Sequence, residues 1–212
     1  MTRMCGRAYE TYTADELYFQ YLNKRPVTLP EITQNTNLRP TQTSPIVRLV
    51  EGERQIDFMR WQLVPRWEPE FKTKLTTINA KSETIFESRL FKGIVVRQRC
   101  IVPLSGFYEW KKEGDTKRPY RIHLQDNSIM SVAGIWDTWR AGTPEARHSF
   151  SILTTSANGF MTAIHDRMPV ILAKKQIDDW LSPEIHEPEI LRNMLQPCSN
   201  DWLACAEVTE KL

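Results

Sequence analysis

The feature of this sequence that most constrains its fold is a series of short apolar segments separated by charged or polar turns. Segments of this length and composition are typical of β-strands, and short turns between them join antiparallel neighbours. The expected strands are Ile46 to Val50, Ile56 to Trp61, Cys100 to Trp110 with a turn at Ser105-Gly106, Tyr120 to Leu124, Ile129 to Trp136, and Phe150 to Thr154. We therefore expect a fold rich in antiparallel sheet.

Helical patterns are fewer. Thr13-Ala14-Asp15-Glu16 has the form of a capping box and predicts a helix from Ala14 to Leu22. Another helix is expected to be capped at Ser82. Two more are expected near the end of the chain, at Lys174 to Leu181 and Glu189 to Leu195. The segment between Pro26 and Pro45 is rich in Pro, Thr and Asn, so we expect an irregular loop there.

Length and charge limit the architecture and the partners. The chain has 212 residues, of which 41% are hydrophobic, and a formal net charge of +2. These values fit one globular domain, and no repeat or linker divides the sequence, so we expect residues 1–212 to form a single domain. Because the charge is nearly balanced, contact with nucleic acid would have to come from a local basic patch.

The four cysteines, Cys5, Cys100, Cys198 and Cys205, include no Cys-x-x-Cys pair and no His at the spacing of a metal site. This pattern argues against a structural zinc site, and no other metal or cofactor is indicated. No segment approaches the length of a membrane span. We therefore expect a reduced, cytoplasmic protein without a disulfide framework.

Cys5 directly follows Met4, so removal of residues 1–4 would turn it into a 1,2-aminothiol. An α-amine with a pKa of about 8 and a thiol with a pKa of about 8.5 both supply some nucleophile near neutrality. The amine condenses with an aldehyde to an imine, and the thiol then closes a five-membered thiazolidine on the same carbon. The alternative is a buried or incidental thiol, which is the commoner state of a lone Cys.

A local basic patch accompanies the helix expected at Ser82. Lys81 precedes this helix, and Arg89 follows about two turns later. Because a helix N-terminus binds phosphate, these charges are compatible with a phosphate site, whereas charge alone favours a solvated helix face.

Three further residues stand out against their surroundings. Glu109 lies in an apolar, aromatic segment, where a carboxylate either faces outward, the commoner case, or is held inward as an acid or base. His165 lies where a short helix meets a strand, and is either a satisfied structural group or a catalyst. Trp67 has polar and proline neighbours and is hard to bury, whereas Trp61 lies in an apolar run and belongs to the core.

Several motifs occur together in a fixed order. They are Met4-Cys5-Gly6-Arg7, Trp61-x-Leu63-x-Pro65-x-Trp67, Asn79-Ala80-Lys81-x-Glu83-Thr84, Pro103-x-x-Gly106-Phe107-Tyr108-Glu109-Trp110 and Ile164-His165-Asp166-Arg167-Met168-Pro169. Together they resemble the SRAP family, the SOS response-associated peptidases or abasic-site processing proteins. The match spans Cys5 to about Leu172, and the agreement in order is far more specific than any single motif.

The resemblance implies an α+β fold with a curved, barrel-like antiparallel β-sheet core and peripheral helices. It implies a role in the DNA damage (SOS) response, in which Cys5, as the first residue, forms a thiazolidine crosslink to abasic sites in single-stranded DNA. Junctions of single and double strands are a further expected substrate. The resemblance also implies autocatalytic removal of the residues before Cys5, AP-lyase-like Schiff-base chemistry, no cofactor, a monomer, and association with the nucleoid on damaged DNA.

The resemblance assigns the chemistry to four residues. Cys5 would supply the amine and the thiol, and Asn79 would position the amine and the sugar. Glu109 would act as general acid and base, and His165 would move a proton at the sugar oxygen.

The resemblance also assigns DNA recognition. Arg7, Lys81 and Arg89 would bind phosphates, Thr154 and Asn37 would line the groove, and Trp67 would stack against a base beside the lesion.

Several positions depart from the family pattern. Residues 1–3 precede Met4, so translation starts at Met4 or a short leader is removed. Lys81 stands where Arg is usual, which keeps the charge but loses bidentate phosphate contact. Arg39 replaces a usually small residue, Gln62 a usual Gly, and Ser105 a common Asp.

Two other function classes stay open. One is a thiol peptidase or amidohydrolase that uses Cys5 with His165 and turns over peptides other than its own leader. The other is a non-catalytic reader of modified or single-stranded DNA, which would bind through Trp67 and the basic residues even when the thiol is blocked.

Overall fold

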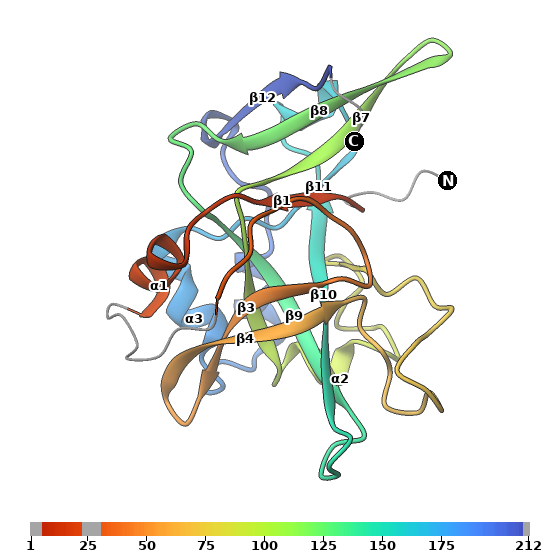
Figure 1. The fold of residues 1–212 in the computed structure, drawn as a ribbon, viewed down its shortest axis with the longest axis vertical. Helices are drawn as coiled ribbons and strands as arrows, with labels where there is room; N and C mark the ends of the chain where they lie inside the picture. Colours follow the sequence, from red (N-terminus) through yellow and green to blue (C-terminus); the bar gives the residue numbers. More distant parts are fainter. Residues whose placement is uncertain (1–5, 23–30, 210–212) are drawn as a thin grey trace.

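The computed structural model describes residues 6–22 and 31–209 of the chain, and strands dominate it (Figure 1). The strands are β1 Ala8–Glu10, β2 Asn35–Leu38, β3 Thr43–Val50, β4 Glu53–Trp61, β5 Asn79–Lys81, β6 Arg99–Leu104, β7 Gly106–Glu113, β8 Thr116–Leu124, β9 Met130–Trp139, β10 Arg147–Ser156, β11 Arg167–Pro169 and β12 Leu203–Glu207. The helices are α1 Ala14–Leu22, α2 Lys92–Val95, α3 Ile177–Leu181 and α4 Pro188–Met194, with the 3₁₀ turns η1 Met161–Ala163, η2 Lys174–Gln176 and η3 Asn200–Trp202.

A seven-stranded sheet forms the barrel. Its order is β11-β10-β4-β3-β6-β9, with β5 beside β10. β10 pairs with β9 as well as with β4, so five strands close on themselves. The pairs are antiparallel except at β10, which runs parallel to β4 and to β5. The α+β barrel expected from the resemblance is thus confirmed, and parallel pairing at β10 closes it.

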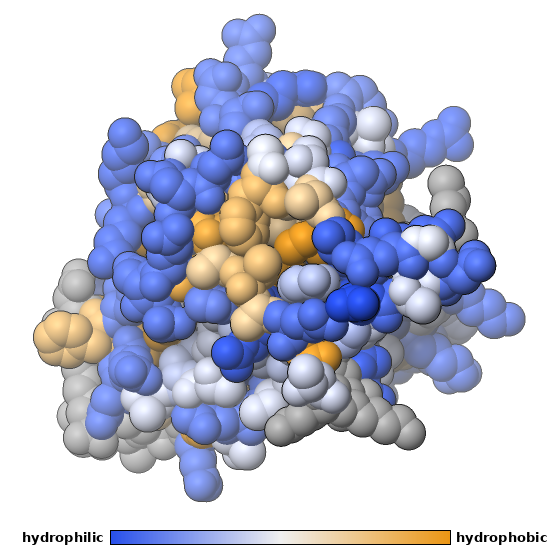
Figure 2. All heavy atoms as spheres, turned by 90° about the horizontal axis from the view of Figure 1, so that it is seen from above, coloured by the Kyte–Doolittle hydropathy of each residue, from blue (hydrophilic) through white to orange (hydrophobic). Residues whose placement is uncertain are grey.

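A second, five-stranded sheet has the order β12-β8-β7-β1-β2 and is antiparallel throughout. Its strands β7, β8 and β12 lie at the upper end of the molecule, where the β7–β8 hairpin projects (Figure 1). Seen from above, the molecule shows a central apolar patch surrounded by hydrophilic residues (Figure 2). This face is therefore not uniformly charged, and any electrostatic contact with DNA depends on local clusters of basic residues.

The barrel strands β6, β9 and β10 are buried on both faces along most of their length. Neighbouring residues such as Ile101 and Val102 belong to two different apolar clusters. One cluster also contains Phe107 of the five-stranded sheet, and the other contains Tyr21 of α1 and Trp180 of α3. Burial of both faces explains why these strands are apolar runs in the sequence rather than strict alternations.

The first helix forms as the sequence predicts. α1 begins after Thr13, whose backbone N–H donates to the Glu16 carboxylate at 2.7 Å, while the Thr13 hydroxyl accepts from the Glu16 N–H at 3.2 Å. These two reciprocal bonds are the capping box. No helix in the described ranges 6–22 and 31–209 is long and apolar enough to cross a membrane.

The helix expected at Ser82 is wrong. Residues 82–87 form consecutive turns, and the short helix α2 starts only at Lys92. The Ser82 N–H donates to the Thr154 carbonyl at 2.8 Å, so pairing with β10 fixes the backbone where the helix would begin. The phosphate site that depended on this helix N-terminus therefore has no structural basis.

Candidate functional site at the edge of β10

The end of β10 brings several predicted residues together. β5 runs parallel to β10 on one side, with Lys81 paired to Thr154, and β11 runs antiparallel to it, with Pro169 also paired to Thr154. Asn79 is half-buried and pairs with Ile152, two residues before Thr154 on β10. Two motifs that lie far apart in sequence, Asn79–Thr84 and Ile164–Pro169, therefore meet at one strand end.

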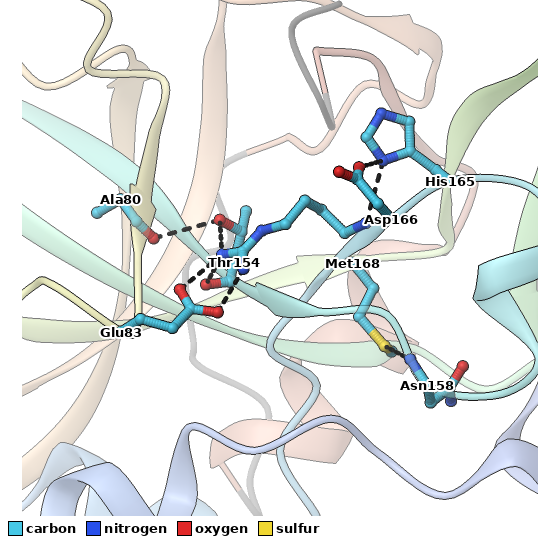
Figure 3. Close-up of polar contacts among 8 residues, drawn as sticks. Ala80, Glu83, Thr154, Asn158, His165, Asp166 and Met168 are labelled. Carbon is cyan, nitrogen blue, oxygen red and sulfur yellow. Dashed lines mark hydrogen bonds and ion pairs between the residues drawn. The ribbon is translucent and has the colours of Figure 1, made fainter.

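An ion pair that sequence reasoning missed holds this junction. The Arg167 guanidinium contacts both carboxylate oxygens of Glu83, at 2.9 Å for the Nη2–Oε2 pair (Figure 3). Nη2 also donates to the Thr154 carbonyl at 2.9 Å and to its hydroxyl at 3.3 Å. Burial is the largest single effect and acts to raise the pKa of the Glu83 carboxyl. The hydrogen bond from Arg167, a backbone hydrogen bond and the charges of Arg167 and Lys81 together outweigh burial, so the pKa is lowered. Glu83 and Arg167 both belong to the sequence motifs, but only the structure shows that they contact each other and hold β5, β10 and β11 together.

His165 follows η1, and its backbone N–H donates to the Met161 carbonyl at 2.8 Å. Its Nδ1 lies 3.1 Å from the Arg167 backbone N–H and 2.9 Å from the Asp166 carboxylate (Figure 3). A neutral Nδ1 accepts from the Arg167 N–H, and then Nε2 carries the proton. Protonated His165 would instead donate from Nδ1 to Asp166, whose side chain is 87% exposed. In the first of these two states, Nε2 carries a proton that it can donate.

Glu109 faces inward, which is the less common of the two placements considered for it. It lies on β7, and the residue is 4% exposed. β1 pairs with β7 through Ala8 and Phe107, and this antiparallel register, continued, places Gly6 opposite Glu109. Cys5 itself lies outside the described residues. The chain that leaves Cys5 therefore runs alongside a buried carboxylate.

Arg7 and Asn37 form a group on the five-stranded sheet. The Arg7 guanidinium lies 5.4 Å from the centre of the Trp110 ring, a cation–π contact. Asn37 on β2 accepts a hydrogen bond from Arg39 Nε at 3.3 Å. Both residues are half-buried.

Trp67 and Arg89 lie apart from these groups in exposed turns. Trp67 is 66% exposed, whereas Trp61 is fully buried, as expected for the two. The turn of Trp67 is fixed at its base, because Trp139 Nε1 donates to the Glu68 carbonyl at 2.7 Å. Arg89 is exposed in a turn before α2, and Lys81 is exposed at the end of β5.

The fold and site define an α+β class built on a mixed barrel, and solved structures share it. A crystal structure of a protein from Bacteroides thetaiotaomicron has a TM-score of 0.82 and 29% identity, covering 96% of this chain and 92% of its own. A family model, SOS response associated peptidase (SRAP), matches residues 4–212. The chain belongs to the SRAP family, as its motifs predict.

Two curated relatives are similar along most of their length. "Abasic site processing protein YoaM" of Bacillus subtilis (strain 168) is 34% identical over 208 residues, covering 97% of this chain and 91% of the relative. "Abasic site processing protein YedK" of Escherichia coli (strain K12) is 30% identical over 189 residues, covering 88% of this chain and 83% of the relative. The match to both relatives extends beyond the motifs into the rest of the barrel.

Proposed function

We propose that this protein processes abasic sites in single-stranded DNA and becomes covalently linked to them through Cys5. The observation that carries the proposal is the burial of Glu109 beside the chain that leaves Cys5. A carboxylate in this place can exchange protons with an N-terminal amine. The names of the relatives YoaM and YedK, abasic site processing proteins, support the same substrate.

The proposed reaction needs no external reagent. The sugar of an abasic site opens to an aldehyde, and the Cys5 amine adds to it to give a carbinolamine. Loss of one water forms the imine, and the thiol sulfur adds to the imine carbon while its proton passes to nitrogen. The product is a thiazolidine, and the net change is aldehyde plus aminothiol giving thiazolidine plus water. The same imine is the intermediate from which AP-lyase-like chemistry would proceed.

Glu109 and His165 would move the protons in separate steps. Glu109 would take a proton from the ammonium group to free the amine, and then return it as the hydroxyl leaves the carbinolamine as water. His165, with its proton on Nε2, would donate to the ring oxygen as the sugar opens. Asn79 on β5 would orient the amine and the sugar through its amide.

DNA recognition would use the remaining predicted residues. Lys81 and Arg89 are exposed cations suited to phosphates. Thr154 is 1% exposed and its hydroxyl accepts from Arg167, so it would contribute by fixing the strand end between the two motifs. Exposed Trp67 offers a ring on which a base can stack. A flipped or unpaired lesion fits such a site, so we infer single-stranded DNA and single–double strand junctions as partners, bound by a monomer in the cytoplasm or at the nucleoid.

Release of the amine is part of the proposal. Residues 1–4 block the Cys5 nitrogen as an amide, which cannot form an imine. We infer that the chain, a single domain, hydrolyses its own Met4–Cys5 bond, consuming one water and leaving a carboxyl on Met4 and an amine on Cys5. Intact mass measurement tests this step, and robust crosslinking by protein that retains Met1 would exclude the aminothiol mechanism.

The central experiment compares two cysteines. Cys5→Ser, made on a chain that starts at residue 5, keeps a free amine but lacks the ring-closing thiol, so it should give only a reversible imine that borohydride traps. Cys205→Ser is the matched control, because Cys205 is a free and exposed cysteine on β12. Glu109→Gln should slow crosslinking by about 10²–10⁴-fold. Heat-stable crosslinks at the unmodified rate with Cys5→Ser would show that another nucleophile acts.

The same variants separate the two other function classes. Turnover of unrelated peptides that is lost with Cys5→Ser and His165→Ala would indicate a general thiol peptidase. Unchanged DNA binding together with no crosslink in any condition would indicate a non-catalytic reader.

A further inference from the structure

Two arginines face each other across the β1–β2 pair. Ala8 pairs with Leu38 in this antiparallel ladder, and the register, continued by one residue, sets Arg7 opposite Arg39. Ala8 and Leu38 are fully buried on the core side, so Arg7 and Arg39 point to the other face of the sheet. Like charges directly opposite each other on neighbouring strands destabilise a sheet.

Local contacts hold both side chains in this arrangement. Arg7 rests on the Trp110 ring at 5.4 Å, and Arg39 Nε donates to the Asn37 side-chain oxygen at 3.3 Å. In the described part of the chain, neither guanidinium forms an ion pair with a carboxylate. Burial and the neighbouring Arg39 both lower the pKa of the Arg7 guanidinium, as expected for two cations with no counter-ion between them.

We propose that Arg39, which stands where the family usually has a small residue, joins Arg7 and Asn37, to which the resemblance already assigns DNA contacts, in a clamp for one phosphodiester of the single-stranded DNA that the protein processes. The clamp rests on the proposed function for its ligand. A phosphate between the two guanidinium groups would turn a repulsive pair into two charge-assisted, bidentate contacts. Because Asn37 uses its oxygen toward Arg39, its amide N–H₂ remains to donate to a phosphate oxygen.

The position of the clamp fits a strand that leaves the reaction site. Arg7 lies two residues from Cys5 in sequence, so its backbone is within about 7 Å of the nucleophile's. Nucleotides stack at about 3.4 Å per step, so a phosphate in the clamp would lie a few nucleotides from the lesion. The clamp therefore would hold the DNA backbone on the side of the five-stranded sheet, away from the cluster at β10.

The test uses Arg39→Gln and undamaged single-stranded oligonucleotide, on which no crosslink forms. Loss of one phosphate contact should reduce the slope of log affinity against log salt by about 0.7 and weaken binding on the order of ten-fold at low salt. Arg97→Gln is the matched control, because Arg97 is an exposed arginine in the turn after α2. An Arg39→Gln slope equal to that of the control would overturn the clamp.

A second readout separates a clamp from a merely structural arginine. Without DNA and at low salt, Arg39→Gln should raise the melting temperature by about 1–3 °C, because it removes the repulsion of Arg7. Inorganic phosphate should raise the melting temperature of the unmodified protein more than that of the variant. The difference between the two melting temperatures should therefore disappear when phosphate is present. A variant that melts lower than the unmodified protein in both conditions would contradict the proposal. Arg39→Lys keeps the charge and should retain most of the salt slope.

The clamp and the covalent chemistry can fail separately. A reduced salt slope together with no crosslink to abasic DNA in the unmodified protein would keep the clamp and reject the crosslinking function. Normal crosslinking with an unchanged slope for Arg39→Gln would reject the clamp alone.

Discussion

The end of β10 and the strand β1 differ in whether an ionisable side chain lies beside an opposite charge. At β10, Arg167 is neutralised by Glu83 and donates twice more to Thr154. At β1, Arg7 faces a second arginine, and Glu10 is a buried carboxyl whose hydrogen bond comes from the neutral Ser44 hydroxyl. Compensated charges hold a structure together, whereas uncompensated charges cost stability and persist where a ligand or a proton balances them.

Arg99 on β6 is a buried cation held by backbone carbonyls instead of a carboxylate, and its loss should have the largest effect. Arg99 is 4% exposed and donates to the backbone carbonyls of Val95 at 2.9 Å and Ile185 at 2.8 Å, and also to those of Trp180 and Ser182. Arg99→Met removes four hydrogen bonds to these carbonyls at once, although the Ser182 carbonyl keeps the Ile185 N–H at 3.3 Å. We expect a loss of more than about 3 kcal/mol in the free energy of unfolding, measured by urea denaturation.

The control for Arg99→Met is Arg97→Met, two residues away and exposed. This control should change the unfolding free energy by less than about 0.5 kcal/mol. Equal losses for the two variants would mean that the carbonyl contacts of Arg99 carry no stability.

Removing an ionisable group that has no counter-charge should instead raise the free energy of unfolding. Burial raises the pKa of Glu10 from 4.5 to about 7, against the smaller lowering effect of the Ser44 hydrogen bond. The folded state therefore holds a proton that the unfolded chain has lost, so stability falls as the pH rises from about 4.5 to 7. A shift of about 2.5 pH units corresponds to about 3 kcal/mol. Glu10→Gln should remove this dependence and be more stable than the unmodified protein at pH 8.

The measurement is urea denaturation of both proteins at pH 5 and pH 8. Glu51→Gln, in the exposed β3–β4 turn, is the control and should leave the pH dependence unchanged. If Glu10→Gln were equally destabilised at both pH values, the carboxylate would be compensated after all, and β1 would not differ from β10.

A double-mutant cycle at Glu83 and Arg167 measures compensation at β10 itself. Glu83→Gln, Arg167→Gln and the double variant should give a coupling energy of about 1 kcal/mol, since the Glu83 side chain is 46% exposed and water screens the pair. The Arg167 single variant should cost more than the Glu83 variant, because it also removes the bonds to Thr154. A coupling energy of zero would leave only the Thr154 bonds to fix the junction.

The difference between the two regions also limits what the sequence could predict. The five closing strands β3, β4, β6, β9 and β10 and the helix α1 were predicted, because burial and capping leave local patterns, whereas β5 was not. β2, within the expected loop, and β12, at the end of the chain, were missed: Asn35–Leu38 is polar, and both strands form only through pairing with β1 and β8. In the same way, Glu109 and His165 stand out in the sequence, whereas the Arg7–Arg39 pair depends on a register that no local pattern records.

The last comparison concerns backbone strain at a neutral residue, Gln62, where the family pattern has Gly. Its φ of +112° is a conformation that costs a non-glycine residue about 1–3 kcal/mol. The side-chain amide donates to the carbonyls of Thr73 and Leu75, both at 3.3 Å, and so ties down the loop that carries Trp67. Here the two hydrogen bonds offset the cost of backbone strain, not that of a charge.

Two substitutions at Gln62 separate the cost of backbone strain from the contribution of the side-chain hydrogen bonds. Gln62→Gly relieves the strain but loses both hydrogen bonds and gains unfolded-state entropy, so stability should change by less than about 1 kcal/mol. Gln62→Ala keeps the strain without the bonds and should cost about 1–2 kcal/mol. In both variants, amide hydrogen exchange in residues 65–77 should accelerate, and binding to undamaged single strands should weaken if Trp67 must be held in place. Unchanged exchange in this loop would mean that the Trp139–Glu68 bond alone anchors it, and that Gln62 is strained without a compensating gain.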